Sequence, residues 1–316
     1  MLYRSVGSLE VSVIGVGCNQ FGPSADRETT AAIVDRALEA GVNFFDTADE
    51  YGPEGVSEEY LGQAIRGRRD RVIVASKFGH HMHGDPERGG ASARWIARAV
   101  EDSLRRLDTD YIDLYQQHFP DPAVTADETL GALERLVRDG KVREIGCCNL
   151  SATDLDERAA LAAANGWRPL VTAQNRLNLL RQEALDTLVP AIERTGMSLL
   201  PFFPLANGIL TGKYRAGHAP PSGTRFADHV EPAQARRMID RDAPRVEALR
   251  AWAEERGHTV AELALAWLSS QPFVASVIAG VTKPAQIEAN AQAAAWGLTA
   301  EEIAEVAAIA RGGSLS

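Results

Sequence analysis

The feature that most constrains this chain is a repeated alternation of short apolar segments with longer amphipathic ones. Each short segment is bounded by polar, glycine or proline residues and is too short for a typical helix, so it predicts a buried strand. Eight such segments follow one another: Val11–Val16, Val42–Phe45, Val72–Ala75, Tyr111–Tyr115, Val142–Gly146, Leu170–Ala173, Ser198–Phe202 and Ala275–Ile278.

Helical patterns lie between these strands. Several are followed by a glycine, which commonly ends a helix: Gly41 follows the first pattern and Gly257 follows the pattern that ends at Arg256. The predicted helices are Thr29–Ala40, Ser92–Arg106, Asp127–Arg138, Ser151–Ala164, Gln182–Arg194, Val246–Arg256 and Val260–Ser269. Strands that alternate with helices predict an α/β fold with parallel strands and crossover helices. Eight units fit a (β/α)8 TIM barrel, which typically takes roughly 250 residues.

A doubly wound sheet is the alternative architecture. It would place a glycine-rich phosphate fingerprint after the first strand, and Gly15, Gly17 and Gly22 have the wrong spacing for one.

The segment Leu205–Ala243 breaks the alternation with many glycines and prolines, which predicts a long functional loop after the seventh strand. Strand and helix patterns resume beyond it, so we expect residues 1–316 to form a single barrel domain with C-terminal helices.

Charge and cysteine content exclude several classes of protein. The formal net charge of −10 disfavours a nucleic-acid partner, which needs a basic surface. The three cysteines, Cys18, Cys147 and Cys148, do not make a disulfide framework and suit a reducing compartment. Residues 1–10 show no signal peptide, and no segment approaches the roughly 20 apolar residues of a membrane span. We therefore expect a cytoplasmic protein with no membrane partner.

Polar residues follow three successive predicted strands, at the end of a barrel where active sites occur. Asp46 and Tyr51 follow the second strand, Lys77 the third and His118 the fourth. A phenol has a pKa of about 10, too high for efficient proton donation at neutral pH, and a lysine ammonium beside it would lower that value. Asp46 would supply the counter-charge, and His118 would orient a substrate carbonyl. This set predicts protonation of a carbonyl oxygen while the carbonyl carbon accepts hydride.

The same motifs resemble those of the aldo-keto reductase superfamily over nearly the whole chain. Residues 45–52 (FDTADEYG), 76–79 (SKFG), 111–118 (YIDLYQQH), 140–146 (GKVREIG), 149–151 (NLS) and 211–214 (TGKY) follow the family's order. The sequence is most similar to the bacterial branch related to aryl-alcohol dehydrogenases and potassium-channel β subunits. The resemblance implies reduction of an aldehyde or ketone by hydride transfer from NADPH, with NADH as the alternative donor and Tyr51 as general acid.

The resemblance also implies roles for individual positions. Its catalytic tetrad falls on Asp46, Tyr51, Lys77 and His118. The cofactor positions are Gly17, Asp46, Cys148, Asn149, Gln174, Phe202, Pro204, Leu205, Gly208, Leu210, Lys213, Gly280, Thr282, Lys283, Gln286 and Asn290. Among them, the resemblance implies that Asn149, Gln174 and Phe202 hold the nicotinamide and that the positions from Gly280 to Asn290 hold the adenosine and 2′-phosphate. The expected substrate-binding residues are Tyr51, His118, Phe21 and Phe119. The chain departs from the commonest pattern at Cys148, Phe202, Gln286 and Ala289, so the preference for NADPH depends largely on Lys283.

Other functions stay open at this point. The fold could serve as an NADPH-binding regulatory or redox-sensing subunit with weak reductase activity, or as a barrel isomerase or lyase that would leave Asn149 and Gln174 unexplained. His80, His81 and His83 suggest a metal, but no carboxylate or cysteine pattern completes a ligand set, and we predict none. The expected partner is a small carbonyl substrate, and the protein would be a monomer or a homo-oligomer.

Overall fold

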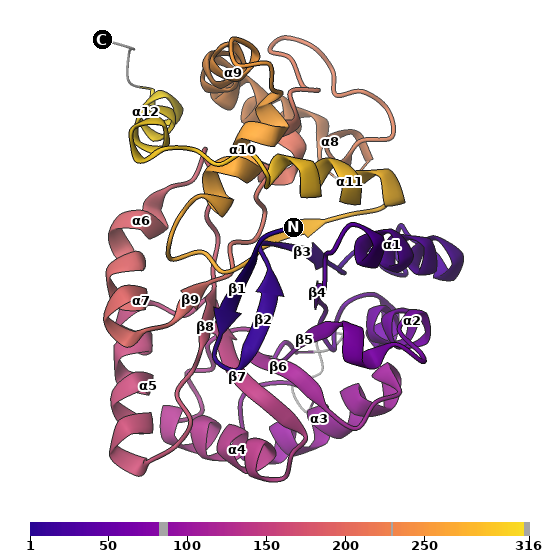
Figure 1. The fold of residues 1–316 in the computed structure, drawn as a ribbon, viewed down its shortest axis with the longest axis vertical. Coiled ribbons are helices and arrows are strands. Elements are labelled where there is room, and N and C mark those ends of the chain that lie inside the picture. The colour runs from indigo at the N-terminus through magenta and orange to yellow at the C-terminus, as the bar shows by residue number, and fades with distance from the viewer. Residues whose placement is uncertain (82–87, 229, 313–316) are drawn as a thin grey trace.

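The computed structural model describes residues 1–81, 88–228 and 230–312 and contains a closed ring of parallel strands (Figure 1). The eight strands of this sheet are β3 (Ile14–Gly17), β4 (Phe44–Asp46), β5 (Ile73–Phe78), β6 (Ile112–Gln117), β7 (Val142–Cys148), β8 (Thr172–Gln174), β9 (Ser198–Leu199) and β10 (Val277–Gly280). They pair in parallel in the order β10-β3-β4-β5-β6-β7-β8-β9. Bridges from Leu199 to Val274 and from Phe202 to Ile278 join the two ends of the sheet. The predicted (β/α)8 barrel is confirmed.

The helices lie outside the strands and bury one apolar stripe against them (Figure 1). The first group is α1 (Arg27–Glu39), α2 (Val56–Ala64), α3 (Ala93–Leu107), α4 (Ala126–Arg138) and α5 (Ala152–Asn165). The second is α6 (Glu183–Thr187), α7 (Val189–Thr195), α8 (Arg225–Asp228), α9 (Pro232–Glu254), α10 (Val260–Ser269), α11 (Pro284–Ala293) and α12 (Ala300–Arg311). Short 3-10 turns η1 (Pro53–Gly55), η2 (Arg69–Arg71) and η4 (Ala206–Thr211) complete the connections. Side-chain oxygens cap several helices, for example Ser92 before α3 and Ser151 before α5.

An N-terminal hairpin closes the end of the barrel that is opposite the expected site. Strands β1 (Tyr3–Val6) and β2 (Leu9–Ser12) pair antiparallel through the two-residue turn at Gly7 and Ser8. The Arg4 guanidinium donates to the carbonyls of Ser269 and Gln271 at 2.7 Å. The sequence analysis missed this hairpin and merged β2 with β3 into one strand, because Val13 continues the apolar run between them.

The predicted long loop at Leu205–Ala243 was wrong in extent. The segment contains η4 and α8, and α9 already begins at Pro232 rather than at Val246. Glu231 caps this helix by accepting from the backbone N–H groups of Ala233 and Gln234, and Pro232 fits its first turn. Pro244 stands inside α9, and a proline normally interrupts a helix, so the sequence pattern concealed the first half of α9.

Candidate active site

Strand register brings the predicted catalytic residues to one end of the barrel. Gly17 of β3 lies opposite Asp46 of β4, and Lys77 of β5 lies opposite Gln116 of β6. Cys148 of β7 lies opposite Gln174 of β8. Because parallel strands end at the same edge, residues from six separate strands meet here.

A buried ion pair lies at the centre of this cluster. Lys77 is fully buried, and its Nζ donates to Asp46 Oδ2 at 2.7 Å and to the Thr47 carbonyl at 2.8 Å. A third donor bond reaches the Tyr51 hydroxyl oxygen at 3.3 Å. A buried ammonium without a partner would be strongly unfavourable, so Asp46 and Thr47 account for its presence. An ammonium only donates, so the Tyr51 oxygen accepts from Lys77 and its own proton is left for another acceptor.

Two glutamines hold the second oxygen of Asp46. Gln174 Nε2 donates to Asp46 Oδ1 at 2.8 Å, and Gln116 Nε2 lies 3.3 Å from the same atom. Gln174 therefore has at least one contact inside the catalytic cluster besides any contact with a cofactor. Gln116 belongs to the motif at residues 111–118, but the sequence analysis gave it no role.

The pKa of Tyr51 moves in the opposite direction to the expectation. Burial raises the pKa of the phenol above its ordinary value, and the Lys77 ammonium opposes this shift without overcoming it. The predicted lowering into the neutral range was therefore wrong. The hydroxyl is protonated at neutral pH, which is the state that a proton donor needs. Burial lowers the pKa of Lys77, but the Asp46 carboxylate outweighs that effect and keeps the lysine charged.

His118 lies beside Tyr51, with the two rings edge to face at a centroid distance of 5.7 Å. Burial and the neighbouring Lys77 hold the pKa of His118 well below its usual range, so its imidazole is neutral. Phe119 stacks on the same imidazole at 4.6 Å and is 38% exposed. Phe119 is thus at the mouth of the site, whereas Phe21 is fully buried in the apolar core.

The residues expected to hold the nicotinamide lie on the strand ends beside this cluster. Asn149 has a left-handed backbone, with φ of 59°, and its Nδ2 donates to the His118 carbonyl at 2.9 Å. The Cys148 thiol is buried, and burial raises its pKa well above the usual value. Phe202 is partly exposed at the bridge that closes the barrel. The Cys147 thiol is also buried, with a pKa raised to about 12, so neither cysteine is activated.

The segment after β9 forms a compact turn rather than an extended loop. Pro204 and Leu210 are buried, Leu205 is partly buried, and Asn207 and Gly208 take left-handed conformations. Lys213 is exposed, and a side chain at position 208 would approach its Nζ to 3.3 Å. A glycine at position 208 therefore leaves room for this lysine.

The expected adenosine positions surround the start of α11. Gln286 Oε1 accepts from the backbone N–H groups of Thr282 at 2.7 Å and of Lys283 at 3.0 Å. Gln286 thus caps the helix and does not lie free for a phosphate. Lys283 is exposed and makes no ion pair with the residues that the structure describes, whereas Asn290 is buried. Gly280 lies opposite Gly17 in the register, and a Cβ on Gly17 would come within 3.2 Å of the Gly280 nitrogen.

Two buried side-chain oxygens beside the expected cofactor positions make no hydrogen bond within the described chain, which fits the binding of an additional polar group. Asn175 Oδ1 and Asn207 Oδ1 are buried and accept no hydrogen bond within the described chain. Such atoms are costly unless a partner satisfies them. Both residues flank expected cofactor positions and were missed in the sequence, and Asn207, directly before Gly208, looks like an ordinary turn residue there. Together with the small Gly17 and Gly280, they are compatible with a bound nicotinamide cofactor.

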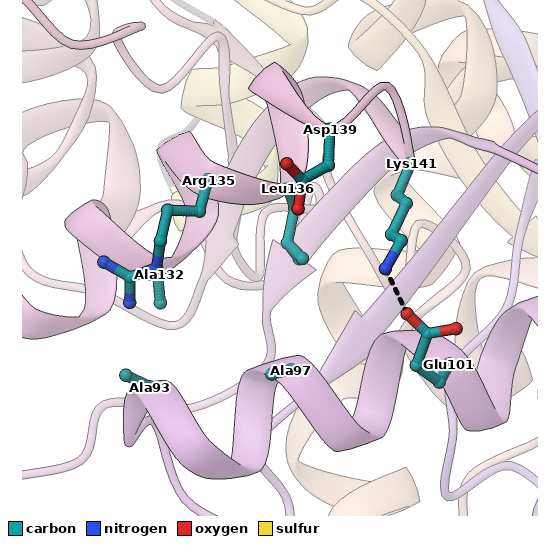
Figure 2. Close-up of a pocket in the computed structure, with 8 residues that line it drawn as sticks. All are labelled: Ala93, Ala97, Glu101, Ala132, Arg135, Leu136, Asp139 and Lys141. Atoms are coloured by element: carbon teal, nitrogen blue, oxygen red, sulfur yellow. Dashed lines mark hydrogen bonds and ion pairs between the residues drawn. The ribbon is translucent and has the colours of Figure 1, made fainter.

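The concavity between α3 and α4 is a separate feature. Figure 2 shows it lined by alanines and by charged residues such as Glu101 and Lys141, which form an ion pair. These residues come from the outer helices and from the segment just before β7, not from the strand ends that carry the catalytic cluster. It therefore belongs to the outer surface and not to the active site.

The described ranges give two further observations. They contain no group of three or more metal-ligating side chains, and His83 of the suggested histidine cluster lies outside them. None of their helices is both long and apolar enough to cross a membrane.

Asp49 offers a test of the electrostatics behind the site. Its carboxylate is buried without a hydrogen-bond partner within the described chain, and burial together with Glu58 raises its pKa well above the usual value. A raised folded-state pKa stabilises the fold below the unfolded pKa of about 3.9, and this stabilisation is lost as the pH rises through the folded value. We expect Asp49→Asn to be more stable than the wild type at pH 7, with a difference that shrinks towards pH 4. Urea unfolding at several pH values measures it, and an equal difference at all pH values would contradict this account.

Comparison with known proteins agrees with the geometry. The family model described as "Aldo/keto reductase family" matches residues 13–311. A probable voltage-gated potassium channel subunit beta from Arabidopsis thaliana is 34% identical over 301 residues, covering 93% of this chain and 91% of the relative. Aldo-keto reductase YhdN from Bacillus subtilis is 34% identical over 311 residues, covering 96% and 91%. L-glyceraldehyde 3-phosphate reductase from Escherichia coli O157:H7 is 30% identical over 304 residues, covering 93% and 87%. The chain belongs to the aldo/keto reductase family.

Proposed function

We propose that this protein reduces an aldehyde or ketone to the corresponding alcohol, with NADPH as hydride donor and Tyr51 as general acid. The observation that carries the proposal is the chain of contacts from Asp46 through Lys77 to Tyr51. Lys77 occupies the phenolic oxygen as a donor, which leaves the Tyr51 proton directed at a substrate oxygen. The ammonium also stabilises the phenolate that remains after the proton has left.

The remaining residues hold the reactants. Asn149, Gln174 and Phe202 would hold the nicotinamide ring, and Lys213 and Lys283 would contact the phosphates as point charges. The bound cofactor supplies the hydride for the carbonyl carbon. His118 and Phe119 would form the wall against which the substrate lies. The buried Asp46 and Lys77 keep water away from the donor side of Tyr51.

A panel of aldehydes and ketones, each offered with NADPH and with NADH, tests this function through the loss of nicotinamide absorbance. We expect turnover with at least one aldehyde and a lower KM for NADPH, because the Lys283 ammonium favours the 2′-phosphate. Lys283→Met should raise the KM for NADPH and leave that for NADH nearly unchanged. The absence of both binding and turnover across the panel would contradict the proposal.

A second candidate is a regulatory subunit that binds NADPH and turns over slowly. It is favoured by the similarity to proteins named as probable potassium channel β subunits. Binding of NADPH, measured by quenching of protein fluorescence, with only slow turnover of every substrate in the panel would favour this candidate over the reductase.

A further inference from the structure

A partly buried carboxylate lies at the mouth of the active site, directly before Tyr51 in the sequence. The Glu50 side chain is 22% exposed, and its Oε2 lies 2.6 Å from Nδ1 of His80. Its Oε1 lies 3.3 Å from Nδ1 of His118, without the alignment of a hydrogen bond. The His118 ring in turn contacts the Tyr51 ring. Glu50 therefore places a negative charge close to the position that we assign to the substrate carbonyl.

Two basic groups act on this carboxylate, and only one of them is free to move away from it. Lys77 and His80 both oppose the rise in pKa that burial causes in the Glu50 carboxyl. The Lys77 ammonium has three N–H donors, and all three are directed at oxygen atoms of the catalytic cluster. The His80 side chain, by contrast, is 45% exposed. A cation that enters from solvent can therefore take the place of His80 beside Glu50, while Lys77 keeps its own partners.

An aromatic ring borders the same group of side chains. The Phe119 ring is 38% exposed, and its centroid lies 5.2 Å from that of His80 and 4.6 Å from that of His118. A carboxylate attracts a cation by its charge, and the face of an aromatic ring attracts a cation through the ring quadrupole. A quaternary ammonium, with methyl groups around its charge, suits this combination especially well. The surroundings of Glu50 therefore favour a cationic ligand group over an anionic one.

We propose that Glu50 and Phe119 form a subsite for a cationic substituent of the substrate, which displaces His80 from the carboxylate. This inference rests on the proposed reductase function and specifies its substrate as an aldehyde that carries an ammonium group. The His118 ring lies beside both the Glu50 carboxylate and the Tyr51 ring, so the ammonium is separated from the carbonyl by a short carbon chain. A carboxylate or phosphate in the same place would be repelled by Glu50.

A pair of isosteric aldehydes tests the subsite. Trimethylammonioacetaldehyde and 3,3-dimethylbutanal have nearly the same shape, and only the first carries a charge. The measured quantity is the ratio of kcat/KM for the charged aldehyde to kcat/KM for the neutral one, with NADPH at pH 8. We expect Glu50→Gln to lower this ratio about fivefold relative to the wild type, the effect of losing one partly exposed charge pair. Because each ratio is taken within one enzyme, differences in the intrinsic reactivity of the two aldehydes cancel.

Two further variants separate the charge from a structural effect. His80→Ala removes the group that lies against Glu50 and should raise the ratio. Glu59→Gln, which removes an exposed carboxylate on α2, is the matched control and should leave the ratio unchanged. A ratio that is equal in the wild type and Glu50→Gln, or that falls in His80→Ala, would contradict the subsite.

Binding of tetramethylammonium distinguishes failure of the subsite from failure of the proposed function. If no aldehyde is reduced, the reductase function fails, and saturation-transfer NMR of tetramethylammonium with the full-length protein still decides the role of Glu50. We expect transfer to the methyl protons in the wild type and in Glu59→Gln, and weaker transfer in Glu50→Gln. Equal transfer in all three proteins would overturn the subsite.

Discussion

Replacement of Tyr51 by phenylalanine is expected to lower kcat for carbonyl reduction by about 100- to 10,000-fold, the usual contribution of a positioned proton donor. The ring and its contact with His118 would remain, and Lys77 would keep its bonds to Asp46 and Thr47. The fold should therefore persist, and the dissociation constant for NADPH should change little. Steady-state kinetics and fluorescence titration of the same preparation measure the two effects separately.

A matched control is Tyr60→Phe, which removes a phenolic hydroxyl from the neighbouring helix α2, where Arg27 lies over the Tyr60 ring. It should reduce carbonyls at nearly the wild-type rate. A Tyr51→Phe enzyme that retained most of its kcat would show that another group protonates the oxygen. A large loss of NADPH affinity in that variant would instead assign the tyrosine to cofactor binding.

The barrel could be predicted because its signals are local and repeated. Buried parallel strands appear as short apolar runs, and caps such as Ser151 with Asp154 and Thr259 with Glu262 mark helix starts directly. The segments missed have opposing local signals. Helix α2 follows Gly52, Pro53 and Gly55, which look like a turn, and Pro244 conceals the first half of α9.

The features of the site also divide into those that the sequence could predict and those that it could not. The positions of Asp46, Lys77 and His118 were predictable because each lies within one residue of the end of a strand, and the register brings strand ends together. The pKa of Tyr51 was not, because it depends on how far burial outweighs the ammonium, and no sequence pattern carries that balance.

Replacement of Lys77 by methionine is expected to affect stability as strongly as activity. Methionine fills a similar volume but leaves the Asp46 carboxylate buried with only the two glutamines as partners. Loss of one member of a buried ion pair typically costs about 3–5 kcal/mol of unfolding free energy. Urea unfolding of the wild type and the variant at pH 7 measures this cost.

The double variant Asp46→Asn/Lys77→Met separates the two roles of the pair. With neither charge present, most of the lost stability should return, because no unpaired charge stays buried. Carbonyl reduction should stay low, because Tyr51 then lacks the Lys77 ammonium, which donates to its hydroxyl oxygen and stabilises its phenolate. Lys141→Met, which breaks an exposed ion pair with Glu101, is the control and should cost less than about 1 kcal/mol. Recovery of activity together with stability in the double variant would show that the ion pair maintains the fold and that Tyr51 does not need Lys77.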